Sequence, residues 1–552
     1  MITMLRRFTI GIPMVLLMSA IALPTRAQPE FRRLPVQEFR DKMKAGWIGQ
    51  IIGVSWGAPT EGKYDKIMPA QDMPPFKESL INDAFGQDDL YVEMTFLRTL
   101  EQHGYEVPIR QAGIDFANSR YALWVANDAG RRNLRNGIAP PDSSHPQFHN
   151  CAGAIDYQIE ADYAGLISPG MPNAVIALGE KFGRLMNYGD GVYAGQFMGV
   201  MYAEAFFEKD PVNLIKAGLK AIPAECLYAE MVRDMLQWRA ENPDWQKTWE
   251  LMIAKYHRNK AYNISALDVK REGACVLMGL LYGEGDLDKS MIISCRCGFD
   301  SDCNPSSSGG ILFTTRGVSQ LPGRYFKQLD EKKKFSYTEY NFPALLEVSE
   351  KLARQALVRA GGRVEKNAAG AEVFLIPIRT VKPSRFEDLK SPGPIAASVF
   401  SDEEMRQINN PGLKWALPHR LAAWKAAGIQ DGSFWWKLND RSEVFEFNSS
   451  KPDAAWTLTR TITLPANQKT KLSLGLGTAN DAWDLVVRLD KSVLMRKTVS
   501  PEATKNNWLD MAVDLTSFAG KTVTLDLTGE ALNKAAKNPP KCRLSAISLR
   551  SE

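Results

Sequence analysis

Hydrophobic residues recur at helical spacing through most of the first two thirds of the chain. From Glu38 to about Ala360, apolar positions follow the three-to-four-residue period of an amphipathic helix, and Ala, Leu and Met are frequent. Few stretches in this region alternate apolar and polar residues as a strand does. The pattern therefore predicts a helix-rich domain. Its clearest helices are expected at Val92 to His103, Pro172 to Met186, Ala194 to Phe207, Val212 to Ala221, Leu267 to Tyr282 and Asp286 to Cys295.

The pattern changes in the last third of the chain. After Pro394, and clearly by Val444, short runs rich in β-branched and aromatic residues alternate with polar residues and are separated by turn residues. Runs with this spacing predict an antiparallel sandwich or jelly roll. The stretch from Val364 to Pro418 holds either a strand pair or a linker. The predicted strands are Trp456 to Leu464, Lys471 to Leu476, Trp483 to Leu489, Leu509 to Leu515 and Thr522 to Leu527.

The first residues have the pattern of a secretory signal. Arg6 and Arg7 precede an apolar run from Ile10 to Leu23, and Thr25-Arg26-Ala27 ends in a small residue that suits cleavage. A membrane anchor is the alternative, but the run is shorter than the roughly 20 residues that span a bilayer, and proline interrupts it. We therefore expect a mature protein that begins near Gln28, has no integral membrane segment and is periplasmic or secreted.

These patterns divide the chain of 552 residues into four parts, which is more than one compact core needs. Residues 1–27 are expected to be the signal peptide and 28–362 a helical catalytic domain. Residues 363–418 are expected to be a linker or bridging segment, and 419–552 a β-sandwich accessory domain.

The charge balance argues against nucleic acid as a partner. The formal net charge of +5 falls to +2 when residues 1–27 are removed, because they contain three arginines and no acid. Lys and Arg are scattered along the chain, whereas nucleic-acid binding needs a basic patch that neutralises phosphates. The expected partner is a small-molecule glycoside or oligosaccharide, and the sequence leaves the oligomeric state open.

Candidate chemistry is concentrated in two acidic clusters, Asp88-Asp89 and Asp300-Ser301-Asp302, more than 200 positions apart. Neighbouring carboxylates repel each other unless a cation lies between them. A hard cation such as Mg²⁺ meets this need because it prefers oxygen ligands. Either cluster alone also fits a helix N-cap or a solvated loop, because Asp is favoured at helix caps.

The residues around the second cluster favour the metal interpretation. Asp300 and Asp302 stand in the run Gly298-Phe299-Asp300-Ser301-Asp302-Cys303-Asn304-Pro305, with serines and glycines following. This run resembles the late signature of the ADP-ribosylglycohydrolase family, G-x-D-[ST]-D followed by Thr or Cys and then Asn. The segments from Gly49 to Gly53 and from Trp56 to Glu61 resemble the family's opening helix and its Gly-Ala-Pro-x-Glu loop. Gln87-Asp88-Asp89 before Met94-Thr95 resembles its first metal-binding segment.

The resemblance extends from about Phe39 to Gly317 and implies both a fold and a site. The fold would be an all-α orthogonal bundle, followed here by a C-terminal all-β sandwich or jelly roll. The site would hold one or two Mg²⁺ ions, with Ca²⁺ or Mn²⁺ as alternatives. Glu61 would act on the substrate, and Asp302 or Asp300 would orient the attacking water. The implied metal ligands are Asp88, Asp89, Asp300 and Asp302.

Three departures from the family pattern change this picture. Gln87 stands where many members supply a Ser or Thr hydroxyl. Cys303 replaces a Thr, and its soft sulfur suits Mg²⁺ poorly, so that Ser301, Asn304 or water could take its place as a ligand. Leu90 and Tyr91 replace small polar residues. We therefore expect a substrate pocket that differs from that of ADP-ribose-specific members.

A further set of polar residues is expected to bind the sugar. The segment from Asp156 to Tyr163 is rich in acids and tyrosines, although an ordinary helix start with solvated acids is an alternative. The segment before Ala194 is either a turn or a pocket loop, and the loop around His149 lies either at the pocket mouth or on the plain surface. The expected substrate-binding residues are Gln158, Glu160, Asp162, Tyr188, Asp190, Tyr193, Asn304 and His149.

The tryptophans of the predicted sandwich have two interpretations. They could offer stacking faces to sugars, or they could form the sandwich core and its contact with the helical domain. They are Trp435, Trp436, Trp456, Trp483 and Trp508.

Three functional hypotheses follow. The leading one is an exported, Mg-dependent glycoside hydrolase of EC class 3.2, cleaving a glycosidic bond of a furanosyl sugar, ribose- or arabinose-like, or of a related sugar. It is preferred because ADP-ribosylated substrates are mostly intracellular. The alternatives are an ADP-ribosyl-(protein) hydrolase, for which Arg296 and Arg316 are candidate pyrophosphate ligands, and a non-catalytic sugar-binding protein.

The sequence contains neither the metalloprotease motif H-E-x-x-H nor the phosphate-binding P-loop.

Overall fold

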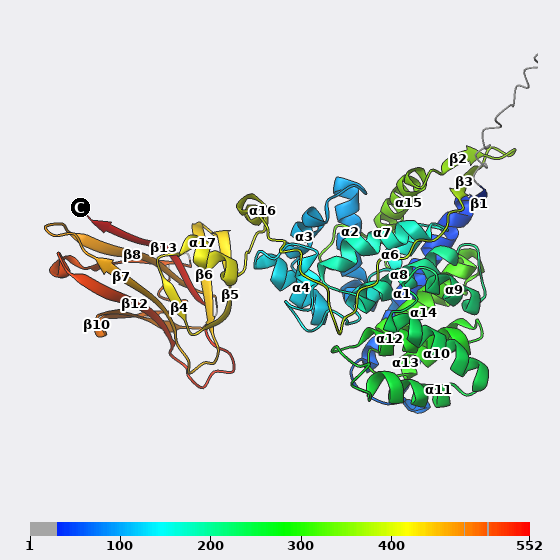
Figure 1. The fold of residues 1–552 in the computed structure, drawn as a ribbon, viewed down its shortest axis with the longest axis horizontal. Coiled ribbons are helices and arrows are strands. Elements are labelled where there is room, and N and C mark those ends of the chain that lie inside the picture. Colours follow the sequence, from blue (N-terminus) through cyan, green and yellow to red (C-terminus); the bar gives the residue numbers. More distant parts are fainter. Residues whose placement is uncertain (1–29, 480, 505–506, 552) are drawn as a thin grey trace, which may run out of the picture.

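The computed structural model describes residues 30–479, 481–504 and 507–551. Figure 1 shows a helical body and a β-sheet body, joined by short connecting elements. The predicted signal peptide lies outside the described residues. No helix in the described part of the chain is long and apolar enough to cross a membrane.

The helical body confirms the helix-rich prediction, because each predicted segment overlaps a helix. Its helices are α1 (Val36–Gly57), α2 (Asp88–His103), α3 (Ile109–Ala117), α4 (Val125–Arg135), α5 (Asp156–Ile159), α6 (Asp162–Leu166), α7 (Pro172–Phe182), α8 (Asp190–Glu204), α9 (Pro211–Leu219), α10 (Leu227–Glu241), α11 (Trp245–Met252), α12 (Val269–Tyr282), α13 (Leu287–Arg296), α14 (Cys303–Arg316) and α15 (Phe342–Arg359).

Helices α1 and α14 pack together at the centre of this body. α1 is buried on almost every side from Phe39 onward, as expected for a helix with apolar residues all round. Gly49 and Gly53 are four residues apart and so share one face of α1. A Cβ at Gly49 would lie 2.6 Å from the Gly309 carbonyl oxygen, and one at Gly53 would overlap the Pro305 carbonyl. The two helix backbones are therefore in direct contact.

A small antiparallel sheet adjoins the helices, an addition to the all-α expectation. Its strand order is β1-β3-β2, from β1 (Phe31–Pro35), β2 (Arg363–Lys366) and β3 (Glu372–Pro377). The stretch for which a strand pair or a linker was expected thus begins as the pair β2 and β3. After β3 the chain runs without regular structure through most of residues 378–401, and the short helices α16 (Asp402–Gln407) and α17 (Leu413–Arg420) follow.

The C-terminal body consists of two five-stranded antiparallel sheets, as predicted for a sandwich. The strand orders are β10-β9-β12-β7-β4 and β11-β8-β13-β6-β5. The strands are β4 (Lys425–Ala427), β5 (Ile429–Leu438), β6 (Arg441–Ser449), β7 (Trp456–Thr463), β8 (Thr470–Thr478), β9 (Trp483–Leu489), β10 (Ser492–Val499), β11 (Leu509–Asp514), β12 (Thr522–Ala531) and β13 (Cys542–Ser551).

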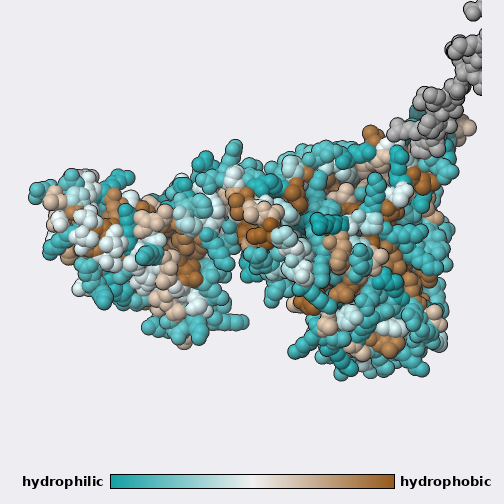
Figure 2. Space-filling model, in the orientation of Figure 1, coloured by the Kyte–Doolittle hydropathy of each residue, from teal (hydrophilic) through white to brown (hydrophobic). Residues whose placement is uncertain are grey.

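Most of the sandwich tryptophans are buried and contribute to packing rather than to the exposed surface. Trp456 and Trp483 are fully buried, with ring centroids 5.9 Å apart, and Trp508 is also buried. Trp436 is half-buried and its Nε1 donates to the Met405 carbonyl of α16. Trp435 is half-buried. On the face shown in Figure 2, hydrophilic side chains cover most of both bodies, with smaller hydrophobic groups between them.

Candidate metal centre and active site

The four aspartates implied as metal ligands lie at the starts of two helices. α2 begins at Asp88 and Asp89, and α14 begins directly after Asp302. Neither helix start has a side-chain cap. The partial positive charge of both helix N-termini therefore favours the carboxylates beside them.

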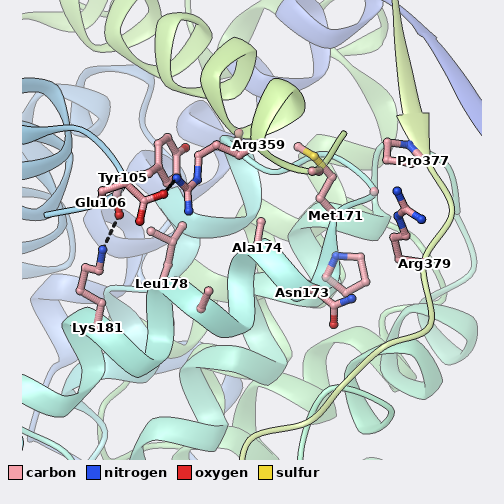
Figure 3. Close-up of a pocket in the computed structure, with 15 residues that line it drawn as sticks. Tyr105, Glu106, Met171, Asn173, Ala174, Leu178, Lys181, Arg359, Pro377 and Arg379 are labelled. Carbon is pink, nitrogen blue, oxygen red and sulfur yellow. Dashed lines mark hydrogen bonds and ion pairs between the residues drawn. The ribbon is translucent and has the colours of Figure 1, made fainter. Parts of the chain in front are cut away.

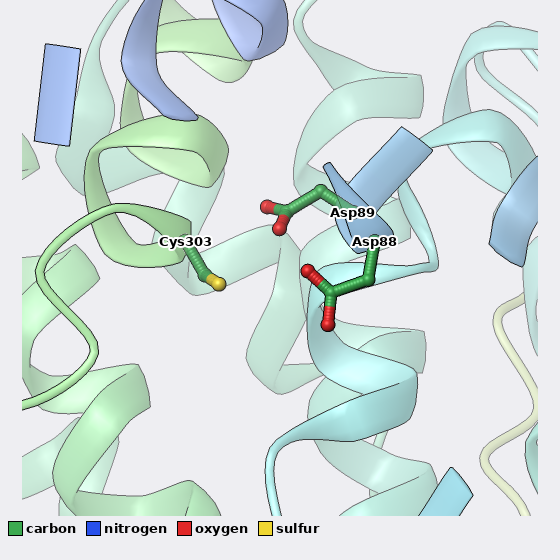
Figure 4. Close-up of side chains that lie close together, drawn as sticks. All are labelled: Asp88, Asp89 and Cys303. Atoms are coloured by element: carbon green, nitrogen blue, oxygen red, sulfur yellow. The ribbon is translucent and has the colours of Figure 1, made fainter. Parts of the chain in front are cut away.

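The two acidic clusters form one centre. Single ligand atoms of Asp88, Asp89 and Cys303 lie within 4.8 Å of one another, and so do those of Asp300, Asp302 and Cys303. Figure 4 shows the Asp88 and Asp89 carboxylates and the Cys303 thiol turned toward a common space between α2 and α14. Cys303 belongs to both groups, so it lies between the two pairs of acids.

The carboxyl groups of this centre are in an unfavourable environment. Asp89 is fully buried, and neither of its carboxylate oxygens has a hydrogen-bond partner among the described residues. Burial, followed by the charges of Asp88 and Asp302, raises the pKa of Asp89 well above its usual range. Burial and then the Glu61 charge raise the pKa of Asp302 to about 7. A cation among these groups would relieve both the repulsion and the lack of partners.

The donor set fits a hard divalent cation. Besides the four carboxylates, the buried Asn304 Oδ1 has no partner in the described part of the chain. Ser301 Oγ, by contrast, shares a hydrogen bond of 2.8 Å with Thr60 Oγ1. Of the two side chains considered as substitutes for the missing Thr, Asn304 is thus the one with a free oxygen. Cys303 is the single soft atom in an otherwise oxygen-rich set.

Glu61 lies in a loop that is tied to the second acidic cluster. The Gly62 amide donates to the Phe299 carbonyl over 3.2 Å, and the Phe299 amide donates to the Tyr64 carbonyl over 2.7 Å. The Glu61 side chain is exposed, yet its charge contributes to the raised pKa values of Asp88 and Asp302. Glu61 therefore lies at the open side of the acidic centre, where a substrate would approach.

Glu160 and Asn304 are the predicted substrate-binding residues that the structure brings close to the acids. Glu160 is fully buried and accepts a hydrogen bond from Asn127 Nδ2, while its Oε2 has no partner within the described ranges. Burial raises its pKa well above the usual range, with smaller contributions from the charges of Asp156 and Asp88. Asn304 Nδ2 donates to Glu272 Oε2 over 3.1 Å.

Tyr188, Asp190 and Tyr193 form hydrogen bonds with backbone groups of other segments. Tyr193 is fully buried; its hydroxyl donates to the Arg385 carbonyl and accepts from the Glu387 amide, each over 2.7 Å. The Tyr188 hydroxyl accepts from the Gly393 amide over 3.1 Å. Both tyrosines thus fix the extended segment that follows β3. The buried Asp190 accepts from the Tyr228 amide at the start of α10 over 2.8 Å.

The remaining predicted substrate-binding residues also have other surroundings. Gln158 and Asp162 are fully buried, and accept hydrogen bonds from the hydroxyls of Tyr228 (2.9 Å) and Tyr202 (2.6 Å) respectively. His149 lines a cleft of about 730 Å³ between the helical body and the sandwich. Burial lowers its pKa to about 4, so the ring is neutral near pH 7. His149 therefore belongs to this cleft.

Two buried acids beside the centre were missed by the sequence analysis. Glu93 accepts from Gln50 Nε2 over 2.7 Å and from the Tyr163 amide over 2.9 Å, and its pKa is raised by burial and then by Asp162. Glu272, whose charge contributes to the raised pKa of Asp300, forms an ion pair with Arg271. Both acids lie in helices that carry further charged residues, so the local sequence pattern does not single them out.

The segment Gly53-Val54-Ser55-Trp56-Gly57 has the G-x-S-x-G spacing of serine hydrolases. That motif acts at a sharp strand-to-helix turn, where the serine is exposed. Here it lies at the C-terminal end of α1, and Ser55 is buried. The structure therefore excludes Ser55 as such a nucleophile.

The fold and the site define a helical protein with an acidic, candidate metal centre, and comparison with known proteins identifies its family. The model of the ADP-ribosylglycohydrolase family matches residues 35–362, more than half of the chain. The chain belongs to this family. Membership supports a glycohydrolase-like function and confirms the expected fold of the helical domain. A search of curated protein sequences finds no match.

Several solved structures are similar to parts of the chain. An "ADP-ribosylglycohydrolase-related protein complex" has 16% identity over 58% of this chain and 99% of that chain, with a TM-score of 0.35. An isomalto-dextranase of Arthrobacter globiformis complexed with panose has 14% identity over 23% of each chain, with a TM-score of 0.16. A 4-O-methyl-alpha-glucuronidase with specificity for decorated arabinogalactans has 12% identity over 68% of this chain and 41% of that chain, with a TM-score of 0.15.

Proposed function

We propose that this protein is an exported, metal-dependent glycoside hydrolase that cleaves a glycosidic bond of a furanosyl or related sugar. One observation carries the proposal: two helix starts bring four aspartates into one buried centre, and the exposed Glu61 lies at its open side. Uncompensated carboxylates in such a group destabilise the fold. Their clustering is therefore best explained by a function that needs them.

The residues that would hold the metal are Asp88, Asp89, Asp300 and Asp302, with Asn304 Oδ1 as a further oxygen. A bound Mg²⁺, or Ca²⁺ or Mn²⁺, would supply positive charge that offsets the carboxylates and holds vicinal hydroxyls of the sugar.

The chemistry of the chain's own residues follows from glycoside hydrolysis. The reaction passes through an oxocarbenium-like state and uses one carboxyl group to protonate the leaving oxygen and another to activate water. Glu61 is exposed and carried by a loop, which suits direct contact with the glycosidic oxygen. Asp302 or Asp300 would orient the attacking water from the buried side of the centre.

The choice of a carbohydrate substrate rests on the predicted signal peptide and on the arginines. Export to the periplasm or the medium would separate the enzyme from intracellular ADP-ribosylated substrates. Arg296 Nε donates to the Met68 carbonyl over 3.0 Å, and Arg316 donates to the Gly285 carbonyl over 2.9 Å. Both candidate pyrophosphate ligands thus already have backbone partners, which supports a sugar without a pyrophosphate group.

ADP-ribosyl hydrolysis is the second candidate, favoured by the name of the matching family. The distinguishing experiment assays the mature protein with Mg²⁺ against nitrophenyl furanosides and pyranosides, with ADP-ribosyl-arginine in parallel. The proposal predicts cleavage of a furanoside, or of a related glycoside, that EDTA stops. Release of ADP-ribose with no cleavage of any glycoside would contradict it and support the second candidate. No turnover of any substrate would favour a non-catalytic sugar-binding protein.

A further inference from the structure

A cavity of about 320 Å³ lies between α7 and the C-terminal end of α15. Figure 3 shows this cavity, which we call the α7–α15 pocket. One wall is formed by Tyr105, just beyond the C-terminal end of α2, whereas Asp88 stands at the N-terminal end of the same helix. At a rise of about 1.5 Å per residue, the two ends of α2 are more than about 20 Å apart. The pocket is therefore separate from the acidic centre.

The lining of the pocket is mainly apolar. Short apolar side chains of α7 face apolar residues at the end of α15 and of β3 across the cavity. Gly170 helps to shape this wall, because its φ of +63° and its closeness to the Phe207 ring leave no room for a side chain. The apolar lining comprises Met171, Pro172, Ala174, Ala177, Leu178, Ala356, Ala360 and Pro377.

Positive charge exceeds negative charge in the walls of this pocket. Arg359 forms an ion pair with Glu106, so these two charges offset each other. The half-buried Lys181 ammonium donates to the Tyr105 carbonyl, and among the described residues it pairs with no carboxylate. Arg379 likewise has no carboxylate partner within the described ranges and lines the pocket from the other side. Two cationic side chains thus remain for a ligand.

Burial of a cation without an anionic partner is unfavourable. Lys181 is such a cation, since burial lowers its pKa and no carboxylate raises it. An anionic group near Lys181 would compensate the charge, and the apolar lining would take up a hydrocarbon body. The volume of about 320 Å³ lies near the lower end of the range of about 300–1,000 Å³ that is typical of small-molecule sites, so the pocket suits a small molecule.

We propose that the α7–α15 pocket binds a small amphiphilic anion, a medium-chain carboxylate, at a site distinct from the acidic centre. The carboxylate pairs with Lys181, and the chain lies over Ala174, Ala177 and Leu178. This proposal does not depend on the glycosidase function.

Calorimetric titration of the full-length mature protein with decanoate, below the concentration at which it forms micelles, tests the proposal. Native protein is expected to bind decanoate. Lys181→Met removes the charge and keeps most of the length of the side chain, and it should weaken binding at least about tenfold. The matched control is Lys216→Met, on the exposed face of α9, which should bind like the native protein.

A second variant tests the apolar part of the pocket. Ala177 is exposed to the cavity, so Ala177→Trp should fill the pocket without unfolding α7, as circular dichroism and the melting temperature would verify. It should abolish decanoate binding. Decanol, which has the same chain and no charge, should bind more weakly than decanoate. Absence of decanoate binding by the native protein, or binding unaffected by both variants, or equal binding of decanol, would overturn the proposal.

Discussion

Glu61 combines an exposed side chain with an electrostatic effect on the buried acids. Its charge helps to raise the pKa of both Asp88 and Asp302, although it stands outside the buried centre. The loop that carries it is tied to Phe299 through backbone hydrogen bonds. This arrangement suits a carboxyl group that meets the sugar while the buried aspartates meet the metal.

The variant Glu61→Gln separates these two roles. It keeps the size of the side chain and removes its proton-transfer ability, so we expect turnover of the furanoside substrate to fall at least about 100-fold. Metal affinity measured by calorimetry should stay within about threefold, because the four aspartates are unchanged. Glu225→Gln, at an exposed site, is the matched control. Native turnover by Glu61→Gln would remove Glu61 from the mechanism.

At the level of single residues, the two acidic clusters could be predicted from the sequence, whereas the buried Glu93 and Glu272 could not. Asp88-Asp89 and Asp300-Ser301-Asp302 are noticeable because adjacent carboxylates need an explanation. Glu93 shares α2 with other charged residues, and its partners Gln50 and Tyr163 are distant in sequence. The hydrogen bonds of Tyr193 could not be predicted either, since its partners lie nearly 200 residues away in the segment after β3.

At the level of elements, the close contact of α1 with α14 positions the second acidic cluster. Gly53 lies against the first turn of α14, at the Pro305 carbonyl. Gly53→Ala would force the helices apart, so we expect a loss of about 1–3 kcal/mol in unfolding free energy and weaker metal binding. Urea unfolding and calorimetry would measure the two effects.

The control for this variant is Gly393→Ala. A Cβ there would meet only the Tyr188 hydroxyl, at 3.7 Å, so stability should change little. If Gly53→Ala retained native stability and metal affinity, the α1–α14 contact would not be what positions the acids.

The sequence pattern predicted strands that carry many buried apolar residues and failed for a mostly exposed strand. β7 was found because its buried residues are apolar, and β9 because it is a mainly apolar run that is buried along almost its whole length. β10 was missed because it is an edge strand whose residues are mostly exposed. The sheet of β1 to β3 was not foreseen as a unit, because Phe31 pairs with Pro377 across more than 300 residues, and such a pairing leaves no local signal.

At the level of the whole molecule, buried acids make stability depend on pH. The pKa values of Asp302 and Asp156 are raised to about 7, and that of Asp162 to about 8, with burial as the main cause in each case. In the unfolded chain these groups release their protons near pH 4. The folded protein therefore binds more protons than the unfolded chain between about pH 4 and pH 8, and stability falls as the pH rises through this range.

We expect the EDTA-treated protein to lose at least about 2 kcal/mol of unfolding free energy between pH 5 and pH 8. Urea unfolding at the two pH values would measure this loss. Mg²⁺ should restore part of it at pH 8, because the ion binds the ionised carboxylates of the folded state, and should have less effect at pH 5. Constant or increasing stability from pH 5 to pH 8 in EDTA would contradict this account of the buried acids.

The central claim is that Asp88, Asp89, Asp300 and Asp302 form a metal centre. The most direct test is a crystal of the mature protein soaked in Mn²⁺, with anomalous diffraction data. We predict an anomalous peak between the starts of α2 and α14, within bonding distance of carboxylate oxygens from both helix starts. A well-ordered site with no such peak would contradict the claim, and with it the metal-dependent glycosidase that we propose.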